Sequence, residues 1–199
     1  MPDHILHSNL RANPALATLL DAAAEIALPD AWLVAGALAQ TVWNTLHGFP
    51  PAHGIRDIDL IYHDPADLSA EAEAAHEARL RRRFGALGLT LDVKNQARVH
   101  LWYERRFGRA IPPHPSSTAA IATFPATATA IGIRLAPGPP AIHAAFGLQD
   151  LFALRVRANR TLASPEVFAA KARRWAEAWP RLSILPWHAG VAAPWRPRA

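Results

Sequence analysis

The most informative stretch of this chain is Arg56-Asp57-Ile58-Asp59-Leu60-Ile61-Tyr62. Carboxylates alternate with aliphatic side chains in it, and in a β-strand residues i and i+2 point to the same face. Ile58 and Leu60 would then enter the core, while Asp57 and Asp59 project together from the other face. Two carboxylates held side by side repel each other, and a bound divalent cation relieves that repulsion. The stretch therefore predicts a strand that carries a candidate metal site.

The segment before this strand predicts a phosphate-binding turn. Residues 31–35 (AWLVA) form a short apolar run typical of a buried strand, and Gly36 ends the run. A helix is expected over residues 38–46, closed by Gly48. A glycine between a strand and a helix lets the backbone approach a ligand, and the free N–H groups of the helix start attract anions.

The remaining elements are predicted from caps, periodicity and turn residues. We expect helices over residues 14–26, 69–85, 147–157 and 164–179, and strands over 89–93, 97–102 and 128–135, with the first two of these strands joined as a hairpin at Lys94-Asn95-Gln96. The tail from Pro186, with its prolines and tryptophans, should be irregular. The order of elements predicts an α/β (α+β) domain with a mixed sheet. We expect a core over residues 1–145, with C-terminal helices and a tail over 146–199 packed on it as one compact unit.

Composition narrows the function classes. The chain has 199 residues and no cysteine, which excludes disulfides, thiolate metal sites and a cysteine nucleophile. We find no signal peptide and no apolar run long enough for a transmembrane helix, so a cytoplasmic location is expected. The net charge of +5 invites a nucleic-acid interpretation. However, the arginines are spread along the chain, and only Lys94 and Lys171 among the 21 basic residues are lysines, which indicates a compositional bias.

A third carboxylate completes a candidate site. Asp92 lies in the expected strand 89–93, and if this strand pairs beside the first, Asp92 can join Asp57 and Asp59. Three carboxylates facing a glycine-opened helix suit a magnesium–triphosphate complex. Lys94 shares the face of Asp92 and could contact a phosphate, and Lys171 could reach the triphosphate from the other side of a cleft; each could instead be an ordinary surface lysine. Gln40 and Asn44, one helical turn apart, either touch the ligand or face water.

These residues resemble the pattern of polymerase-β-like nucleotidyltransferases. That pattern is a glycine followed by glycine or serine, a helix, Asp-x-Asp on a strand, and a third carboxylate on a later strand; here it falls on Gly36-Ala37, Asp57-Ile58-Asp59 and Asp92. The chain is more closely similar to a family of largely uncharacterised bacterial nucleotidyltransferase-like proteins. The matching blocks are residues 36–44 (GALAQTVWN), 54–60 (GIRDIDL), 93–100 (VKNQARVH), 146–152 (FGLQDLF), 171–175 (KARRW) and 185–187 (LPW).

The resemblance implies a nucleotidyltransferase fold, an NTP substrate and a two-metal magnesium site. It implies that Asp57 and Asp59 are metal ligands, and that Asp92 is the third carboxylate, which helps to deprotonate or orient an acceptor hydroxyl. The residues expected to bind the nucleotide are Gly36, Ala37, Gln40, Arg56, Lys94, Asn95 and Lys171. Ala37 departs from the pattern, because it offers a backbone N–H but no hydroxyl. Two alternatives stay open: a non-catalytic nucleotide- or partner-binding module on the same fold, and a nucleic-acid-binding protein.

Overall fold

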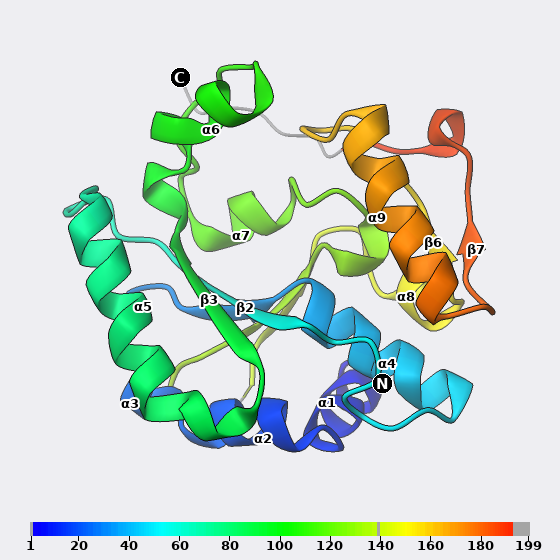
Figure 1. Cartoon of the computed structure of the whole chain (residues 1–199), viewed down its shortest axis with the longest axis horizontal. Helices are drawn as coiled ribbons and strands as arrows, with labels where there is room; N and C mark the ends of the chain where they lie inside the picture. Colours follow the sequence, from blue (N-terminus) through cyan, green and yellow to red (C-terminus); the bar gives the residue numbers. More distant parts are fainter. Residues whose placement is uncertain (1, 139, 193–199) are drawn as a thin grey trace.

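A five-stranded mixed sheet forms the centre of the protein. The computed structural model describes residues 2–138 and 140–192, and the strands lie in the order β3-β2-β1-β4-β5 (Figure 1). Their bounds are β1 (Trp32–Val34), β2 (Asp57–Tyr62), β3 (Thr90–Asn95), β4 (Ile131–Arg134) and β5 (Ile142–Ala144). The pair β2/β3 is parallel, and the other pairs are antiparallel. The expected mixed α/β sheet domain is confirmed.

Helices flank this sheet. They are α1 (Pro2–Arg11), α2 (Pro14–Asp21), α3 (Ala23–Ile26), α4 (Gly36–His47), α5 (Ala70–Phe84), α6 (His100–Phe107), α7 (Ser117–Ile121), α8 (Gln149–Phe152) and α9 (Pro165–Ala178). Figure 1 shows α5 beside β3 at one side of the molecule, and α8 and α9 at the other side with the short pair β6 (Arg155–Val156) and β7 (Ser183–Ile184). Across the described ranges, no helix combines the length and the apolar character needed to cross a membrane.

The C-terminal helix α9 packs on α4 through tryptophans. The Trp43 ring meets the Trp175 and Trp179 rings edge to face, at centroid distances of 5.7 and 5.5 Å. Trp179 Nε1 also donates a hydrogen bond of 2.6 Å to Asn44 Oδ1. Gly54 lies against the same indole with φ +69°, and a Cβ there would come within 2.7 Å of Trp179. One continuous core therefore joins the sheet, α4 and the C-terminal segment.

Several predicted elements are confirmed. Helix α4 ends at Gly48, which adopts φ +72° as a left-handed cap. Helix α5 begins after Ser69, whose side chain accepts the Ala72 N–H at 3.2 Å. Helix α9 begins after Ser164 and ends before Trp179, as its start signal predicts. The bounds of these helices depend on capping residues at their own ends, so they can be predicted from the local sequence.

The predicted hairpin after residue 93 is wrong. The chain leaves β3 into a 3₁₀ turn, Gln96–Arg98, and then into α6, so residues 97–102 form no strand. The Asn95 side chain is the physical reason, because its Oδ1 accepts the N–H groups of Ala97 and Asp64, each at 3.0 Å, and starts a turn.

Three other expectations need correction. The helix expected over 14–26 is divided at Ala22 into α2 and α3, and α1 was not expected. The helix expected over 147–157 is only the short α8, because Leu154 adopts φ +53° and the chain turns into β6. In the tail, a 3₁₀ turn forms at Trp187–Ala189, whereas Trp195 lies outside the described residues.

Candidate functional site

The parallel pair β2/β3 brings the three predicted carboxylates to one face. Asp59 and Asp92 are direct Cα partners across the two strands, and Asp57 lies two residues before Asp59. The intervening Ile58 and Leu60 are fully buried on the opposite face. All three aspartates line a cavity of about 300 Å³, which we call the carboxylate cavity. The alternating aspartates of the sequence thus come together with Asp92 in one cavity of the structure.

The start of α4 forms one wall of the carboxylate cavity. Gly36 is the first helical residue, and both Gly36 and Gln40 line the cavity. A Cβ on Gly36 would lie 3.1 Å from Gln40 Nε2, so the glycine keeps this wall open. The preceding Ala35 adopts φ +60°, a strained conformation for a residue with a Cβ. The backbone is therefore held in an unfavourable geometry at the point where helix N–H groups can meet an anion.

Basic side chains of α9 form the facing wall. Lys171 and Arg174 both line the carboxylate cavity, across from the strands. Burial lowers the pKa of Lys171, and Arg174 lowers it further, while Asp59 and Asp57 act in the opposite direction. The expected contact of Lys171 with a triphosphate stays a prediction.

Asp92 is already paired within the protein. Lys94 Nζ lies 2.7 Å from Asp92 Oδ1 and 2.7 Å from Glu77 Oε2. Burial acts to lower the pKa of Lys94, but the hydrogen bonds to Asp92 and Glu77 outweigh burial and raise it. Lys94 therefore fixes the position of the third carboxylate, and Glu77 fixes the position of Lys94.

Asp57 and Asp59, in contrast, have no partner of their own in the described part of the chain, in either hydrogen bonds or ion pairs. Burial raises the pKa of Asp59 to about 7, and the nearby Asp57 and Asp92 charges contribute to the rise, while Lys171 and Arg174 oppose it. A pair of close, unpaired carboxylates is an electrostatic cost that a cation would remove.

The donor set fits magnesium bound together with a nucleotide. Within residues 2–138 and 140–192, no three His, Cys, Asp or Glu side chains come close enough to hold a metal ion by themselves. Magnesium is typically held by one or two carboxylates and by phosphate oxygens of the substrate, and seldom by an all-protein cage. Two unpaired aspartates beside a helix start meet that description.

Three residues expected to bind the nucleotide do not line the carboxylate cavity. Ala37 is fully buried beneath it, and the Arg56 side chain is exposed outside it. Asn95 is fully buried, and its Nδ2 donates to the Asp64 and Asp67 carbonyl oxygens at 2.9 and 3.0 Å. The structure therefore gives Asn95 an architectural role. Asn44 is likewise buried, and its Nδ2 donates to the Pro51 and His53 carbonyl oxygens.

Sequence reasoning missed other side chains at this site. Gln96 and Thr129 line the carboxylate cavity, and nothing in their local pattern indicates it. Glu77, the second partner of Lys94, lies on α5, and its position in the sequence gives no sign of this contact. Arg174 could have been found, because it follows Lys171 by three residues on one helix and so shares its face.

A helix start, an Asp-x-Asp strand and a third carboxylate on the parallel neighbouring strand define a nucleotidyltransferase fold. The comparisons with known proteins agree. A family model described as Nucleotidyltransferase matches residues 21–184, and the chain belongs to this family. The family and the fold make it an enzyme of nucleotidyl transfer.

Two solved structures are similar to the chain. One is an NMR structure that reveals a CCA-adding enzyme head domain; it has a TM-score of 0.73 and 26% identity, and the match covers 90% of this chain and 94% of that one. The other is a tRNA-processing enzyme in an apo form, with a TM-score of 0.40, 18% identity, and coverage of 89% and 41%; this weak match carries no argument. Comparison with curated protein sequences finds no match.

Proposed function

We propose that the protein transfers a nucleoside monophosphate from an NTP to a hydroxyl acceptor, in a magnesium-dependent reaction that releases pyrophosphate. The observation that carries this proposal is the pair Asp57 and Asp59, unpaired and facing the Gly36 end of α4 in one cavity. Such a reaction needs a pool of NTPs, so we place the protein in the cytoplasm.

The triphosphate would lie between the start of α4 and helix α9. The N–H groups at the start of α4 and the Gln40 amide can donate to phosphate oxygens. Lys171 and Arg174 supply positive charge from the facing wall. Ala37 adds no hydroxyl, so the binding of phosphate rests on the backbone and on these two basic residues.

Asp57 and Asp59 would hold the magnesium ions together with the phosphate oxygens. A bound ion would supply charge neutralisation at the phosphates and would lower the pKa of a coordinated acceptor hydroxyl. The two aspartates keep their oxygens free for this task because no basic side chain in the described chain pairs with them.

Asp92 would act on the acceptor. The acceptor oxygen forms a bond to the α-phosphorus, and the bond from the α-phosphorus to the α,β-bridging oxygen breaks, so that pyrophosphate leaves with the electron pair. The hydroxyl proton passes to the Asp92 carboxylate. Lys94, anchored by Glu77, holds that carboxylate in place, and is thus a positioning residue.

The test is label transfer from α-phosphate-labelled NTPs by the variant in which both Asp57→Asn and Asp59→Asn are made. We expect magnesium-dependent transfer and pyrophosphate release by the wild type, with both lost in the double variant. Glu71→Gln, an exposed carboxylate on α5, is the matched control and should keep wild-type activity. Undiminished transfer by the double variant would refute the proposed role of the two aspartates.

A non-catalytic module is a second candidate, favoured by two observations. Ala37 lacks the hydroxyl of the wider pattern, and Asp92 is engaged by Lys94. This candidate predicts tight magnesium-dependent NTP binding with no pyrophosphate release for any acceptor class tested. Pyrophosphate release that requires Asp92 would exclude it.

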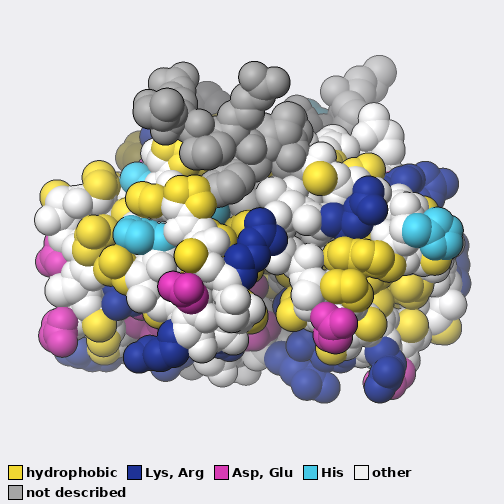
Figure 2. Space-filling view, turned by 90° about the horizontal axis from the view of Figure 1, so that it is seen from above, with side chains coloured by type: hydrophobic (Ala, Val, Ile, Leu, Met, Phe, Trp, Pro, Cys, Tyr) yellow, Lys and Arg dark blue, Asp and Glu magenta, His cyan; other side chains and the backbone are white. Residues whose placement is uncertain are grey.

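A nucleic-acid acceptor is suggested by the CCA-adding head domain to which the fold is similar. On the face seen in Figure 2, Lys and Arg side chains occupy separate positions among other residues and form no continuous stripe. The basic residues are also spread along the sequence, and we expect weak and salt-dependent RNA binding at most. A steep salt dependence over several phosphates would instead favour a nucleic-acid acceptor.

A further inference from the structure

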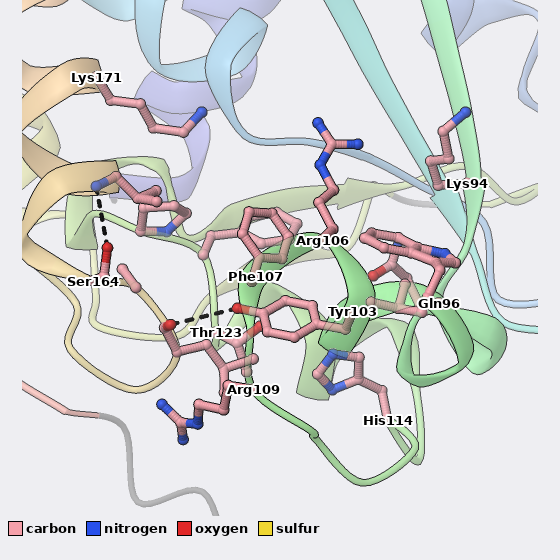
Figure 3. A pocket seen from close by; sticks show the side chains of 17 residues that line it. Lys94, Gln96, Tyr103, Arg106, Phe107, Arg109, His114, Thr123, Ser164 and Lys171 are labelled. Carbon is pink, nitrogen blue, oxygen red and sulfur yellow. Dashed lines mark hydrogen bonds between the residues drawn. The ribbon is translucent and has the colours of Figure 1, made fainter.

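A second cavity of about 640 Å³ adjoins the carboxylate cavity. It lies between α6, the segment around residues 123–125 and the start of α9 (Figure 3), and we call it the aromatic cavity. The two cavities share the side chains of Lys94, Gln96, Phe124, Pro125 and Lys171. Its size falls within the range of pockets that bind small molecules. One ligand can therefore extend from the carboxylates into the aromatic cavity.

Helix α6 supplies the aromatic walls. Trp102, Tyr103 and Phe107 line the cavity, although none of the α6 side chains is fully buried. The Tyr103 hydroxyl donates to the Leu162 carbonyl oxygen at 3.4 Å, which ties α6 to the segment before α9. Partly exposed aromatic faces of this kind are stacking surfaces for a planar ring.

A buried histidine adds an uncharged polar group. His114 lines the aromatic cavity, is only 3% exposed, and its Nδ1 has no hydrogen-bond partner among the residues described. Burial lowers the pKa of His114 to about 4, and the nearby His63 and His100 add to this effect. The imidazole is therefore neutral at physiological pH, and it suits a neutral hydrogen-bonding partner better than an anion.

Basic side chains line both ends of the aromatic cavity: Lys94 and Lys171 lie at the junction with the carboxylate cavity, and Arg109 lies at the other end. Figure 3 shows Lys94, Lys171 and Arg106 on one side of the aromatic cavity, with Tyr103 and His114 on the other. The Arg106 guanidinium lies 6.0 Å from the Trp102 ring centroid and 5.6 Å from that of Phe107. The cavity is thus basic beside the carboxylates and aromatic along α6, and His114 and Arg109 line its other end.

We propose that the aromatic cavity is the subsite for the nucleobase of the NTP. The two adjoining cavities suit one nucleotide, with its phosphates in the carboxylate cavity, its base stacked against the α6 aromatic side chains, and the edge of the base at His114. This inference rests on the proposed function, which places the phosphates of an NTP in the adjoining carboxylate cavity. The same molecule accounts for both cavities without a second ligand.

The test compares the affinities of NTPs and of inorganic tripolyphosphate, each with magnesium, by calorimetry. Trp102→Ala and His114→Phe should each weaken the binding of at least one of the common NTPs by about 10-fold, the scale of a lost base stack for Trp102 and of a lost hydrogen bond for His114. Neither change should alter tripolyphosphate affinity by more than about 2-fold, since the phosphates lie in the other cavity. Trp102→Phe, which keeps a ring, should restore most of the NTP affinity.

The control is Leu101→Ala, which changes the neighbouring α6 residue, 58% exposed and outside the cavity lining. Far-UV circular dichroism and unchanged tripolyphosphate binding show that each variant is folded. Wild-type NTP affinity in both Trp102→Ala and His114→Phe, or a loss of turnover alone, would overturn the nucleobase subsite and leave the proposed function standing. Failure of the wild type to bind any NTP would instead refute the proposed function.

Discussion

The carboxylate cavity and the aromatic cavity share Lys94 and Lys171, yet they are built differently. The first is built on two paired strands and a helix start, and its charged groups follow from strand periodicity. The second is closed by α6 and by segments far apart in the sequence, and it is lined by aromatic and basic side chains but by no carboxylate. The side chains proposed for catalysis are therefore held on paired strands, whereas those proposed to recognise the base lie on segments that connect the main elements.

The largest effect should come from the carboxylate cavity alone. We expect Asp59→Asn to reduce label transfer by about 10³-fold, because metal-assisted charge stabilisation is worth several kcal/mol. Initial rates with saturating labelled NTP would measure this loss. If Asp59→Asn reduced the rate of label transfer no more than Trp102→Ala does, the proposed division between a catalytic cavity and a base-binding cavity would be wrong.

Asn95 lies between Lys94 and Gln96, which line both cavities, and we expect Asn95 itself to contribute to the fold alone. Asn95→Ala removes four hydrogen bonds to buried or partly buried backbone groups and should lower the free energy of unfolding by about 3 kcal/mol. Urea unfolding would measure this change. At temperatures where the variant is folded, its NTP affinity should equal that of the wild type, and weaker binding would restore Asn95 to the ligand site.

Lys171 lies on the border between the cavities, so its loss should affect both ligands. We expect Lys171→Met to weaken NTP and tripolyphosphate binding alike, by about 10-fold or more, because a charge-assisted contact to phosphate is removed. Arg173→Met, an exposed neighbour on α9, is the matched control. A selective loss of NTP over tripolyphosphate would instead assign Lys171 to the base or sugar.

The smallest effect is a gain in stability. The pKa of Asp59 is raised to about 7 in the folded protein against 3.8 for the unperturbed group, so the fold favours the protonated form. The free energy of unfolding of the wild type therefore declines as pH rises between these values. Asp59→Asn has no carboxyl group at this position, so it lacks this part of the pH dependence. In urea without divalent cations, the variant should gain on the order of 1–2 kcal/mol at pH 8 and much less at pH 5. An equal gain at both pH values would contradict this electrostatic account.

The same contrast explains which features the sequence could predict. The proximity of Asp57, Asp59 and Asp92 could be predicted, because alternation sets the face of each strand and parallel pairing brings the two strands together. The aromatic cavity was not found, because residues 97–102 also alternate and were assigned to a strand, whereas Asn95 turns the chain into α6. His114 had no local signal at all, since its place depends on segments packed from distant parts of the chain.

The most direct test of the central claim is the magnesium dependence of NTP binding. Calorimetry with a non-hydrolysable NTP should show that the wild type binds tightly with magnesium and at least about 10-fold more weakly with a chelator. The variant with both Asp57→Asn and Asp59→Asn should bind weakly and equally in the two conditions. Magnesium-dependent binding of wild-type strength by this variant would contradict the claim that the paired aspartates hold the metal–nucleotide complex.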